Sequence, residues 1–322
     1  MIASNRQHTL AQATSFEGIG LHTGKHAQLR ILPGEADTGY VFVRKDLEGE
    51  PTIAAHVSNV GETRRGTTLQ SGDVSVHTTE HVLAALYASG IDNAVLELDG
   101  PEVPILDGSA LPFMSQIEAA GSVELEADRR FFKVHKNLSY RGDDGVEMLI
   151  VPLEEPEFKV TVMVDYNSPV LGTQHARLED LSAFKTDIAG CRTFVFLKEV
   201  ASLAEQGLIQ GGDIDNAVVL AERAYSASEL KDIAQTLGRD TLNGAADQPG
   251  VVNTSDLRFP NEPARHKLLD IVGDLALTGR FIQGHVLAAR PGHAANVAFA
   301  KEVAKAIRAQ EELPDFRTAR PS

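Results

Sequence analysis

The fold is indicated by the stretch EHVLAALYASGIDNAVLEL, residues 80–98, and by RHKLLDIVGDLALTGRFIQGHVLAAR, residues 265–290. In each stretch an apolar helical pattern ends near a glycine and is followed by an apolar strand. The two can be laid over each other with a few inserted residues, and His81 then falls on His266, near the start of its helix. This weak internal duplication predicts two similar α/β layers, with a site between them that both halves build.

Strand-like alternation surrounds both stretches, as in EFKVTVMVDY at residues 157–166. RFFKVHKNLSY, residues 130–140, is expected to form one further strand. The boundary between the halves is expected near the charged segment ELEADRR, residues 124–130. This predicts a first domain over residues 1–127 and a second over residues 128–322.

Three other segments have distinct patterns. Residues 194–220 indicate an extra strand–helix–strand unit, in which the pair Gly211–Gly212 marks a turn. Residues 235–262 are rich in Asn, Asp, Gly and Pro and are expected to form a long loop. GIGLHTGK, residues 18–25, is expected to be a β-hairpin turn, because it lacks the glycine and lysine spacing of a phosphate-binding loop.

The composition narrows the class of protein. The chain has 322 residues, a formal net charge of −15 and a single cysteine, Cys191. One cysteine excludes an internal disulfide and a cysteine-based zinc cluster, and it fits a reducing compartment. The negative charge disfavours nucleic-acid binding, which needs a positive field.

The same sequence bears on location and assembly. The N-terminus lacks the apolar core of a signal peptide, and the apolar runs fall far short of the roughly 18 residues that span a membrane. We therefore expect a soluble, cytoplasmic protein without a transmembrane segment, which could still visit a membrane surface. A monomer is the default expectation, because the sequence shows no coiled-coil heptads.

The first candidate for chemistry is HTTEH, residues 77–81. On a helix, His77 and His81 would share a face, and the segment has the H-x-x-E-H pattern of inverted zincins, with Glu80 as general base. The helix can also begin after His77, which would leave that residue as a surface or capping group.

The second candidate is RHKLLDIVGD, which places His266, Asp270 and Asp274 on one face of a predicted helix. A histidine and an aspartate one turn apart can form a simple surface pair. However, two acids on a mostly apolar helix are costly unless they are paired or bind a metal. Catalytic zinc takes three protein ligands, which His266, Asp270 and His81 would supply, and Glu80 would then lie near the bound water.

The third candidate is His293 in RPGHAAN, after a Pro-Gly turn and before a predicted helix. It could be a capping or surface residue. It could also be a protonated group that donates to a leaving amine, with Asp274 orienting it and raising its pKa. The residues alone leave these readings open.

Together the motifs resemble the UDP-3-O-acyl-N-acetylglucosamine deacetylase family, which carries out the committed step of lipid A biosynthesis in Gram-negative bacteria. The resemblance spans about residues 8–310. Its motifs are GIGLHTGK, CRTFVF, RHKLLDIVGDLAL followed by GH, and TTEHVLAALYASGIDNAVLELDGPEVPILDGSALPF. It implies an α+β fold of two similar β/α two-layer sandwich domains packed around the active site. It also implies zinc-dependent hydrolysis of the N-acetyl group of a UDP-linked acylated glucosamine, although two histidines and an aspartate also suit Fe²⁺.

The resemblance also implies roles for individual residues. The metal ligands would be His81, His266 and Asp270. Glu80 matches the general base, and His293 matches the general acid.

Further matches concern the reacting groups and the substrate. Asp274 matches the residue that orients and charges the histidine, and Thr193 matches a residue that stabilises the oxyanion. Phe194 and Lys267 match substrate contacts. Arg290 stands where the family often has a lysine near the diphosphate, and it keeps the charge with a different geometry. The unit at residues 194–220 matches an insert that forms an apolar passage for the acyl chain.

Two other function classes remain alternatives. A non-catalytic carrier or sensor of acylated nucleotide sugars would need the apolar passage but neither Glu80 nor His293. An inverted-zincin peptidase would need His77 as a metal ligand, whereas in the resembled family that residue is not one.

Overall fold

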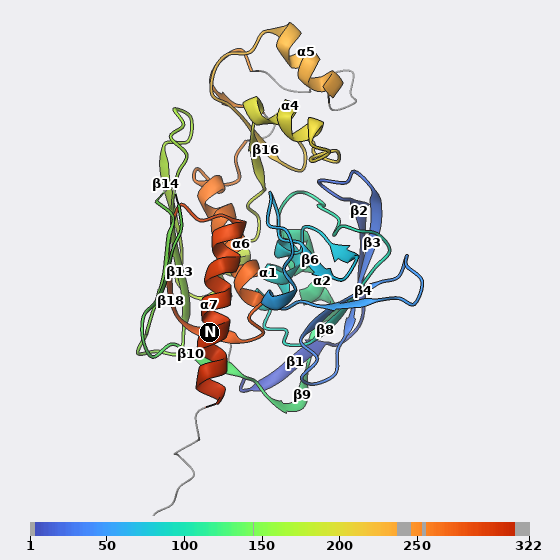
Figure 1. The fold of residues 1–322 in the computed structure, drawn as a ribbon, viewed down its shortest axis with the longest axis vertical. Coiled ribbons are helices and arrows are strands. Elements are labelled where there is room, and N and C mark those ends of the chain that lie inside the picture. Colours follow the sequence, from blue (N-terminus) through green and yellow to red (C-terminus); the bar gives the residue numbers. More distant parts are fainter. Residues whose placement is uncertain (1–3, 144, 237–245, 253–255, 313–322) are drawn as a thin grey trace, which may run out of the picture.

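Each half of the molecule contains a β-sheet in which five strands are hydrogen-bonded in the same relative order. The computed structural model describes residues 4–143, 145–236, 246–252 and 256–312. The first sheet has the order β2-β3-β8-β4-β5 and the second the order β11-β12-β18-β13-β14. In both, the central strand pairs antiparallel with one neighbour and parallel with the other. The α+β fold class with two similar halves is therefore confirmed (Figure 1).

The strands of each sheet come from the corresponding half of the chain. The strands of the first sheet are β2 (Thr14–Ile19), β3 (His26–Pro33), β4 (Tyr40–Arg44), β5 (Thr52–Ala54) and β8 (Ala94–Leu98). Those of the second are β10 (Phe131–Lys133), β11 (Leu138–Arg141), β12 (Glu147–Val151), β13 (Phe158–Asp165), β14 (Thr173–Leu178) and β18 (Phe281–Ala289). Two small pairs lie outside them: β1 (Arg6–Leu10) with β9 (Ser122–Asp128), and β6 (Leu69–Ser71) with β7 (Val74–Val76).

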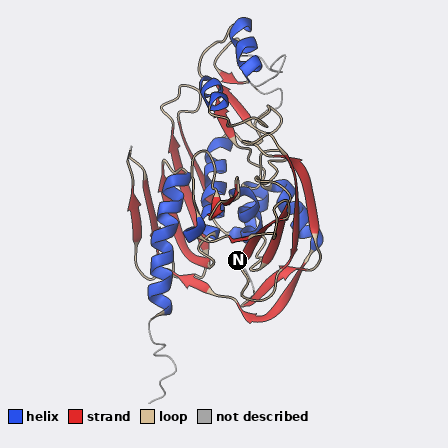
Figure 2. Ribbon diagram, turned by 45° about the vertical axis from the view of Figure 1, so that its right-hand side comes forward, coloured by secondary structure: helices blue, strands red, loops and turns tan. Residues whose placement is uncertain are grey.

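The helices lie between the two sheets. They are α1 (Glu80–Ala88), α2 (Leu111–Ala120), α3 (Phe184–Asp187), α6 (Glu262–Ala276) and α7 (His293–Glu311). In Figures 1 and 2, α1 and α6 lie between the two sheets, where α1 from the first half contacts α6 from the second. Eight of the nine residues of α1 are buried, because this helix is covered on all sides. The α1–α6 contact is where the two halves can build one site.

The strand expected over residues 130–140 is wrong in one respect. The segment forms two strands, because β10 pairs parallel with β18 while β11 pairs antiparallel with β12.

The turn expected at residues 18–25 is confirmed, since β2 and β3 pair as an antiparallel hairpin around it. The domain boundary at residues 127/128 stays a prediction, and β9 ends at Asp128.

A separate layer extends from one end of the second half, at the top of Figure 1. Its elements are β15 (Phe194–Phe196), α4 (Leu197–Glu205), β16 (Val218–Ala221), α5 (Ala227–Thr236) and β17 (Gly250–Val251). We call residues 194–252 the insert. The segment expected as a loop over residues 235–262 contains β17 and the first residue of α6, and its residues 237–245 and 253–255 lie outside the described ranges. Within the described ranges no helix has the length and apolar character to cross a membrane.

Candidate metal centre and active site

Helices α1 and α6 bring three potential metal ligands together. The residues His81, His266 and Asp270 are 3%, 2% and 0% exposed, and one donor atom of each lies within 4.8 Å of the others. Asp270 Oδ1 lies 3.4 Å from His266 Nε2 and 4.0 Å from His81 Nε2. Two imidazole nitrogens and a carboxylate oxygen thus converge from both halves of the chain.

The chemistry of these donors fits a divalent metal ion. His266 Nδ1 lies 3.0 Å from the Cys191 carbonyl oxygen, to which it can donate, leaving the Nε2 lone pair toward Asp270. Asp270 Oδ1 is buried and makes no hydrogen bond within the described part of the chain. Burial lowers the pKa of His81 to about 3 and also lowers that of His266. Both imidazoles are therefore neutral near pH 7, as metal ligation requires.

Asp270 has a second partner that keeps it ionised. Its Oδ2 accepts a hydrogen bond of 2.5 Å from Lys267 Nζ. Burial would raise the pKa of Asp270, but Lys267 and the neighbouring histidines lower it further than burial raises it. The Lys267 ammonium also lies 5.5 Å from the centre of the Phe194 ring, which places the two predicted substrate contacts side by side.

Glu80 is the first residue of α1 and faces the same centre. It is 3% exposed, and burial raises its pKa to about 7. Its Oε2 accepts a hydrogen bond of 3.0 Å from the backbone N–H of Thr67. The other oxygen, Oε1, lies 3.9 Å from His293 Nε2. A carboxyl group of this kind can exchange a proton near neutral pH.

His293 is the first residue of α7 and is surrounded by carboxylates. Its Nε2 lies 3.6 Å from Asp270 Oδ2, and its Nδ1 lies 3.4 Å from Asp274 Oδ2. Burial would lower its pKa, but Asp270, Glu80 and Asp274 outweigh burial and raise the pKa to about 9. His293 is therefore protonated at neutral pH. Asn296, one turn further along α7, donates to Asp274 Oδ2 over 2.9 Å and helps to orient it.

Thr67 is a member of this network that the sequence analysis missed. It is fully buried, and its hydroxyl donates to Asp274 Oδ1 over 2.5 Å and lies 3.2 Å from His293 Nδ1. With its backbone N–H on Glu80, it contacts all three acid–base groups. No spacing in the sequence indicates it, since it lies in a loop. The sequence gives a weak indication of Asn296, because this residue stands three positions after His293.

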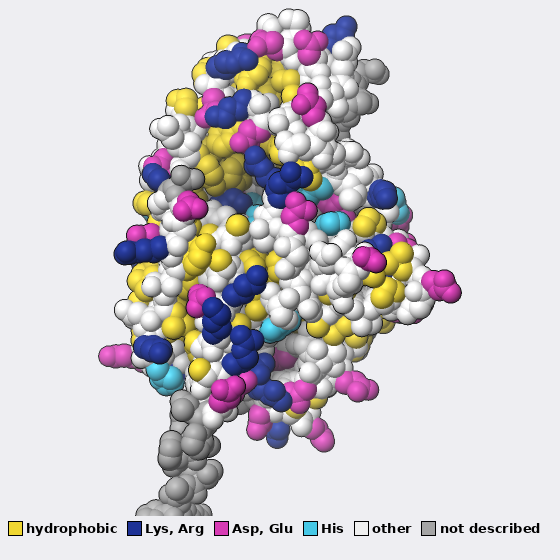
Figure 3. All heavy atoms as spheres, viewed as in Figure 1, with side chains coloured by type: hydrophobic (Ala, Val, Ile, Leu, Met, Phe, Trp, Pro, Cys, Tyr) yellow, Lys and Arg dark blue, Asp and Glu magenta, His cyan; other side chains and the backbone are white. Residues whose placement is uncertain are grey.

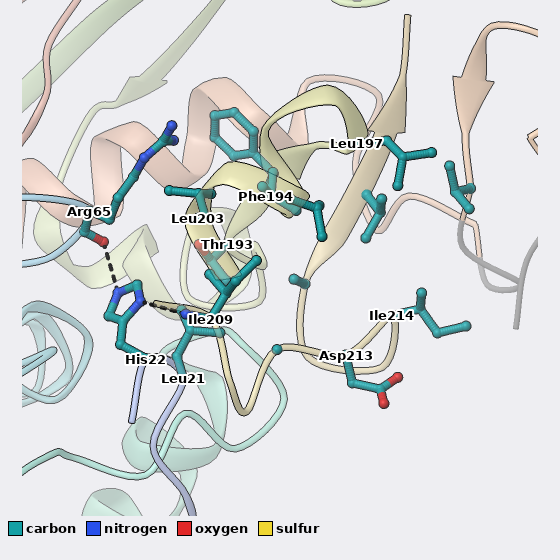
Figure 4. Close-up of a pocket in the computed structure, with 16 residues that line it drawn as sticks. Leu21, His22, Arg65, Thr193, Phe194, Leu197, Leu203, Ile209, Asp213 and Ile214 are labelled. Carbon is teal, nitrogen blue, oxygen red and sulfur yellow. Dashed lines mark hydrogen bonds between the residues drawn. The ribbon is translucent and has the colours of Figure 1, made fainter. Parts of the chain in front are cut away.

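An apolar cavity opens beside the metal centre and continues under the insert. Thr193 and Phe194 line it, together with Leu197, Val200 and Leu203 of α4. His22 lies on the other side of the cavity (Figure 4). On the face shown in Figure 3, hydrophobic side chains also gather where the insert joins the body, with Lys and Arg side chains beside them. The strand–helix pair β15–α4 therefore supplies an apolar wall next to a charged site.

Two residues that the sequence analysis considered for the site lie outside the metal cluster. Arg290, at the end of β18, forms an ion pair with Asp165, with 2.8 Å between Arg290 Nη2 and Asp165 Oδ2. His77 precedes α1 and lies outside the cluster, where its ring nitrogens contact the hydroxyls of Thr68 at 2.9 Å and Ser75 at 3.3 Å. His77 is thus accounted for by polar contacts away from the metal donors.

Comparison with known proteins shows which family the chain belongs to. A bifunctional enzyme LpxC/FabZ of Chlorobaculum tepidum is 45% identical over 301 residues, which are 93% of this chain and 64% of that protein. This chain thus spans just under two thirds of that relative's length. UDP-3-O-acyl-N-acetylglucosamine deacetylases of Citrifermentans bemidjiense and Nostoc sp. are 41% and 37% identical, over 93% and 92% of this chain and 89% and 98% of their own lengths. The family model described as LpxC, UDP-3-O-acyl N-acetylglycosamine deacetylase, matches residues 7–235 and 238–305, and the chain belongs to this family.

Proposed function

We propose that this chain removes the N-acetyl group of UDP-3-O-(3-hydroxyacyl)-N-acetylglucosamine, giving acetate and the free amino sugar. This is the committed step of lipid A biosynthesis, and we propose that it takes place in the cytoplasm of a Gram-negative bacterium. The observation that carries the proposal is the buried cluster of His81, His266 and Asp270, with Glu80 and His293 facing it. Family membership indicates which amide such a cluster would cleave.

In this proposal His81, His266 and Asp270 hold a zinc ion, although Fe²⁺ suits the same ligands. Zinc bound there would lower the pKa of a coordinated water toward about 7 and polarise the acetyl carbonyl. Glu80 accepts the proton of the attacking water, since its own pKa is about 7. His293 starts protonated and gives its proton to the leaving amine. Asp274 holds the ring of His293 by its Nδ1 side, and Thr193 donates to the oxyanion.

The substrate contacts follow from the surroundings of the cluster. The acyl chain would occupy the apolar cavity lined by Phe194 and α4. The anionic diphosphate needs local positive charge in a chain of net charge −15. We propose that Lys267 supplies it beside the cluster and that Arg290, which lies outside the cluster at the end of β18, supplies a second positive charge. We propose that the chain acts as a monomer on this UDP-sugar without nucleic acid, and approaches membranes only peripherally.

The direct test is acetate release from the UDP-linked acylated sugar by the purified protein. We expect turnover that a chelator removes and that added Zn²⁺ restores. Glu80→Gln and His293→Ala should each lower kcat by roughly 10²- to 10⁴-fold, the usual contribution of one acid–base group. Turnover in either variant close to that of the unmodified chain would remove the role assigned to that residue.

The alkaline limb of the pH–rate profile should report the ionisation of His293. Its protonated form is the active one, and the pKa of the ring is raised to about 9, so the rate should fall as the pH rises through that region. Asp274→Asn removes one of the carboxylates that raise this pKa. The alkaline limb of the variant should therefore move to lower pH, which kcat measured between pH 6 and about 10 would show. A limb that stays in place would mean that another group titrates there.

A further inference from the structure

A short loop of the first half lies across the insert. Residues 61–67, GETRRGT, leave and rejoin the small β6–β7 region, and we call them the strap. Its two ends are closed on each other, because Gly61 N–H donates to the Thr68 carbonyl and Thr68 N–H donates to the Glu62 carbonyl, both over 3.0 Å. The strap is therefore a loop of defined conformation, held at both ends.

Two side chains of the strap contact α4 and the residue that follows it. Arg65 Nη2 lies 3.0 Å from Glu199 Oε2, and Arg64 Nη1 donates to Gln206 Oε1 over 3.1 Å. Glu199 lies in the first turn of α4, and Gln206 is the residue after its last one, Glu205, so the two contacts lie near opposite ends of the helix. The strap therefore meets the α4 segment at two points, in addition to the packing of Leu197, Val200 and Leu203 in the core of the insert.

The other end of the strap is attached to the catalytic groups. Thr67 binds Glu80 and Asp274, as described above, and its carbonyl accepts the N–H of Thr79 over 3.2 Å. Between this anchor and α4, Arg65 adopts a left-handed backbone conformation with φ of 64° and its carbonyl contacts the ring of His22. The strap thus connects the reacting centre to the insert over a few residues.

Arg65 itself lines the apolar cavity, beside the α4 residues Val200 and Leu203. Figure 4 shows Arg65 at one edge of the lining residues, with Ile214 near the other. The contact between Arg65 and Glu199 is an ion pair without hydrogen-bond alignment, because Glu199 Oε2 is buried and makes no hydrogen bond in the described ranges. Arg65 places a positive charge 3.0 Å from this oxygen.

We propose that the Arg65–Glu199 ion pair holds α4 against the first half and thereby closes the side of the cavity, which makes Arg65 a residue that determines specificity for long acyl chains. The inference rests on the proposed function, since it assigns the cavity to an acyl chain. A chain lying between α4 and the strap would be covered on both sides only while the pair is closed. A short acyl group would not reach α4 and would not depend on the pair.

The test compares two substrates with the zinc-loaded protein: the UDP-sugar with a long 3-hydroxyacyl chain, and the same sugar carrying a 3-O-acetyl group. Arg65→Gln and Glu199→Gln should each raise KM for the long-chain substrate about three- to five-fold, the effect of one partly exposed ion pair. kcat, and all constants for the acetyl substrate, should stay unchanged. The double reversal Arg65→Glu with Glu199→Arg should restore part of the discrimination.

Arg223→Gln is the matched control, because Arg223 forms a similarly exposed ion pair with Glu229 in the same insert, away from the cavity. It should leave both substrates unaffected. Equal losses for both substrates in Arg65→Gln, a loss confined to kcat, or long-chain constants like those of Arg223→Gln would overturn the proposal. Failure of the unmodified protein to release acetate would instead refute the proposed function, so the two failures are distinguishable.

Discussion

Replacing Asp270 with alanine is expected to remove the bound metal and to lower acetate release by about 10³-fold or more. A metal ion contributes several kcal/mol of transition-state stabilisation, and each 1.4 kcal/mol is about a factor of ten in rate. Asp270 supplies the one anionic donor of the cluster, in contact with His81 and His266. The variant also leaves the largely buried Lys267 ammonium without its carboxylate partner, which repels a cation from the same place.

His77→Ala is the matched control for this experiment. His77 lies near α1 and belongs to the H-x-x-E-H pattern, but its contacts are with Thr68 and Ser75. We expect the variant to keep full metal content and activity. Metal content measured by elemental analysis, with acetate release on the same preparations, decides the matter. Loss of metal from His77→Ala together with retention in Asp270→Ala would support an inverted-zincin site and refute the one proposed here.

The sequence could predict the parts of the site that lie on regular, apolar elements. The functional face of α6 can be recognised in the sequence, because two carboxylates, Asp270 and Asp274, interrupt an otherwise apolar run. The overlay of residues 80–98 on 265–290 placed β8 and β18 in corresponding positions, and both are the central strands of their sheets. Central strands are buried on at least one face, so their apolar residues indicate that they lie in the middle of a sheet.

The parts that could not be predicted depend on contacts between remote loops. Thr67 acts only because the strap passes Glu80 and Asp274, and nothing in GETRRGT indicates such neighbours. Helix α5 was also missed. Its apolar positions, Leu230, Ile233 and Ala234, form one short stripe in an otherwise polar segment of ten residues, and only Ala234 is buried. Whether His77 would join His81 as a metal ligand depended on where α1 begins, and helix ends are the least certain feature of a sequence pattern.

Gly273→Ala is expected to separate the two helices that carry the site. A Cβ at Gly273 would lie 2.1 Å from the carbonyl oxygen of Glu80 and 2.8 Å from its carbonyl carbon. These are backbone atoms of α1, so no side-chain rotation can relieve the clash, and α1 must move away from α6. Inside a helix, alanine is normally more favourable than glycine by about 0.5–1 kcal/mol. Here we expect the opposite sign, a loss of about 1–3 kcal/mol in the free energy of unfolding.

The same displacement should impair catalysis beyond the loss of stability. Glu80 and His81 move with α1, while His266 and Asp270 stay on α6, and an error of about 1 Å in such a constellation costs roughly 10²-fold in rate. Gly190→Ala is the control, because a Cβ there would meet its nearest neighbour, Leu111 Cδ2, at an ordinary 3.8 Å. Thermal unfolding and acetate release, measured well below the unfolding temperature, separate the two effects. If Gly273→Ala kept both the stability and the turnover of the unmodified chain, close contact between α1 and α6 could not be what assembles the metal centre.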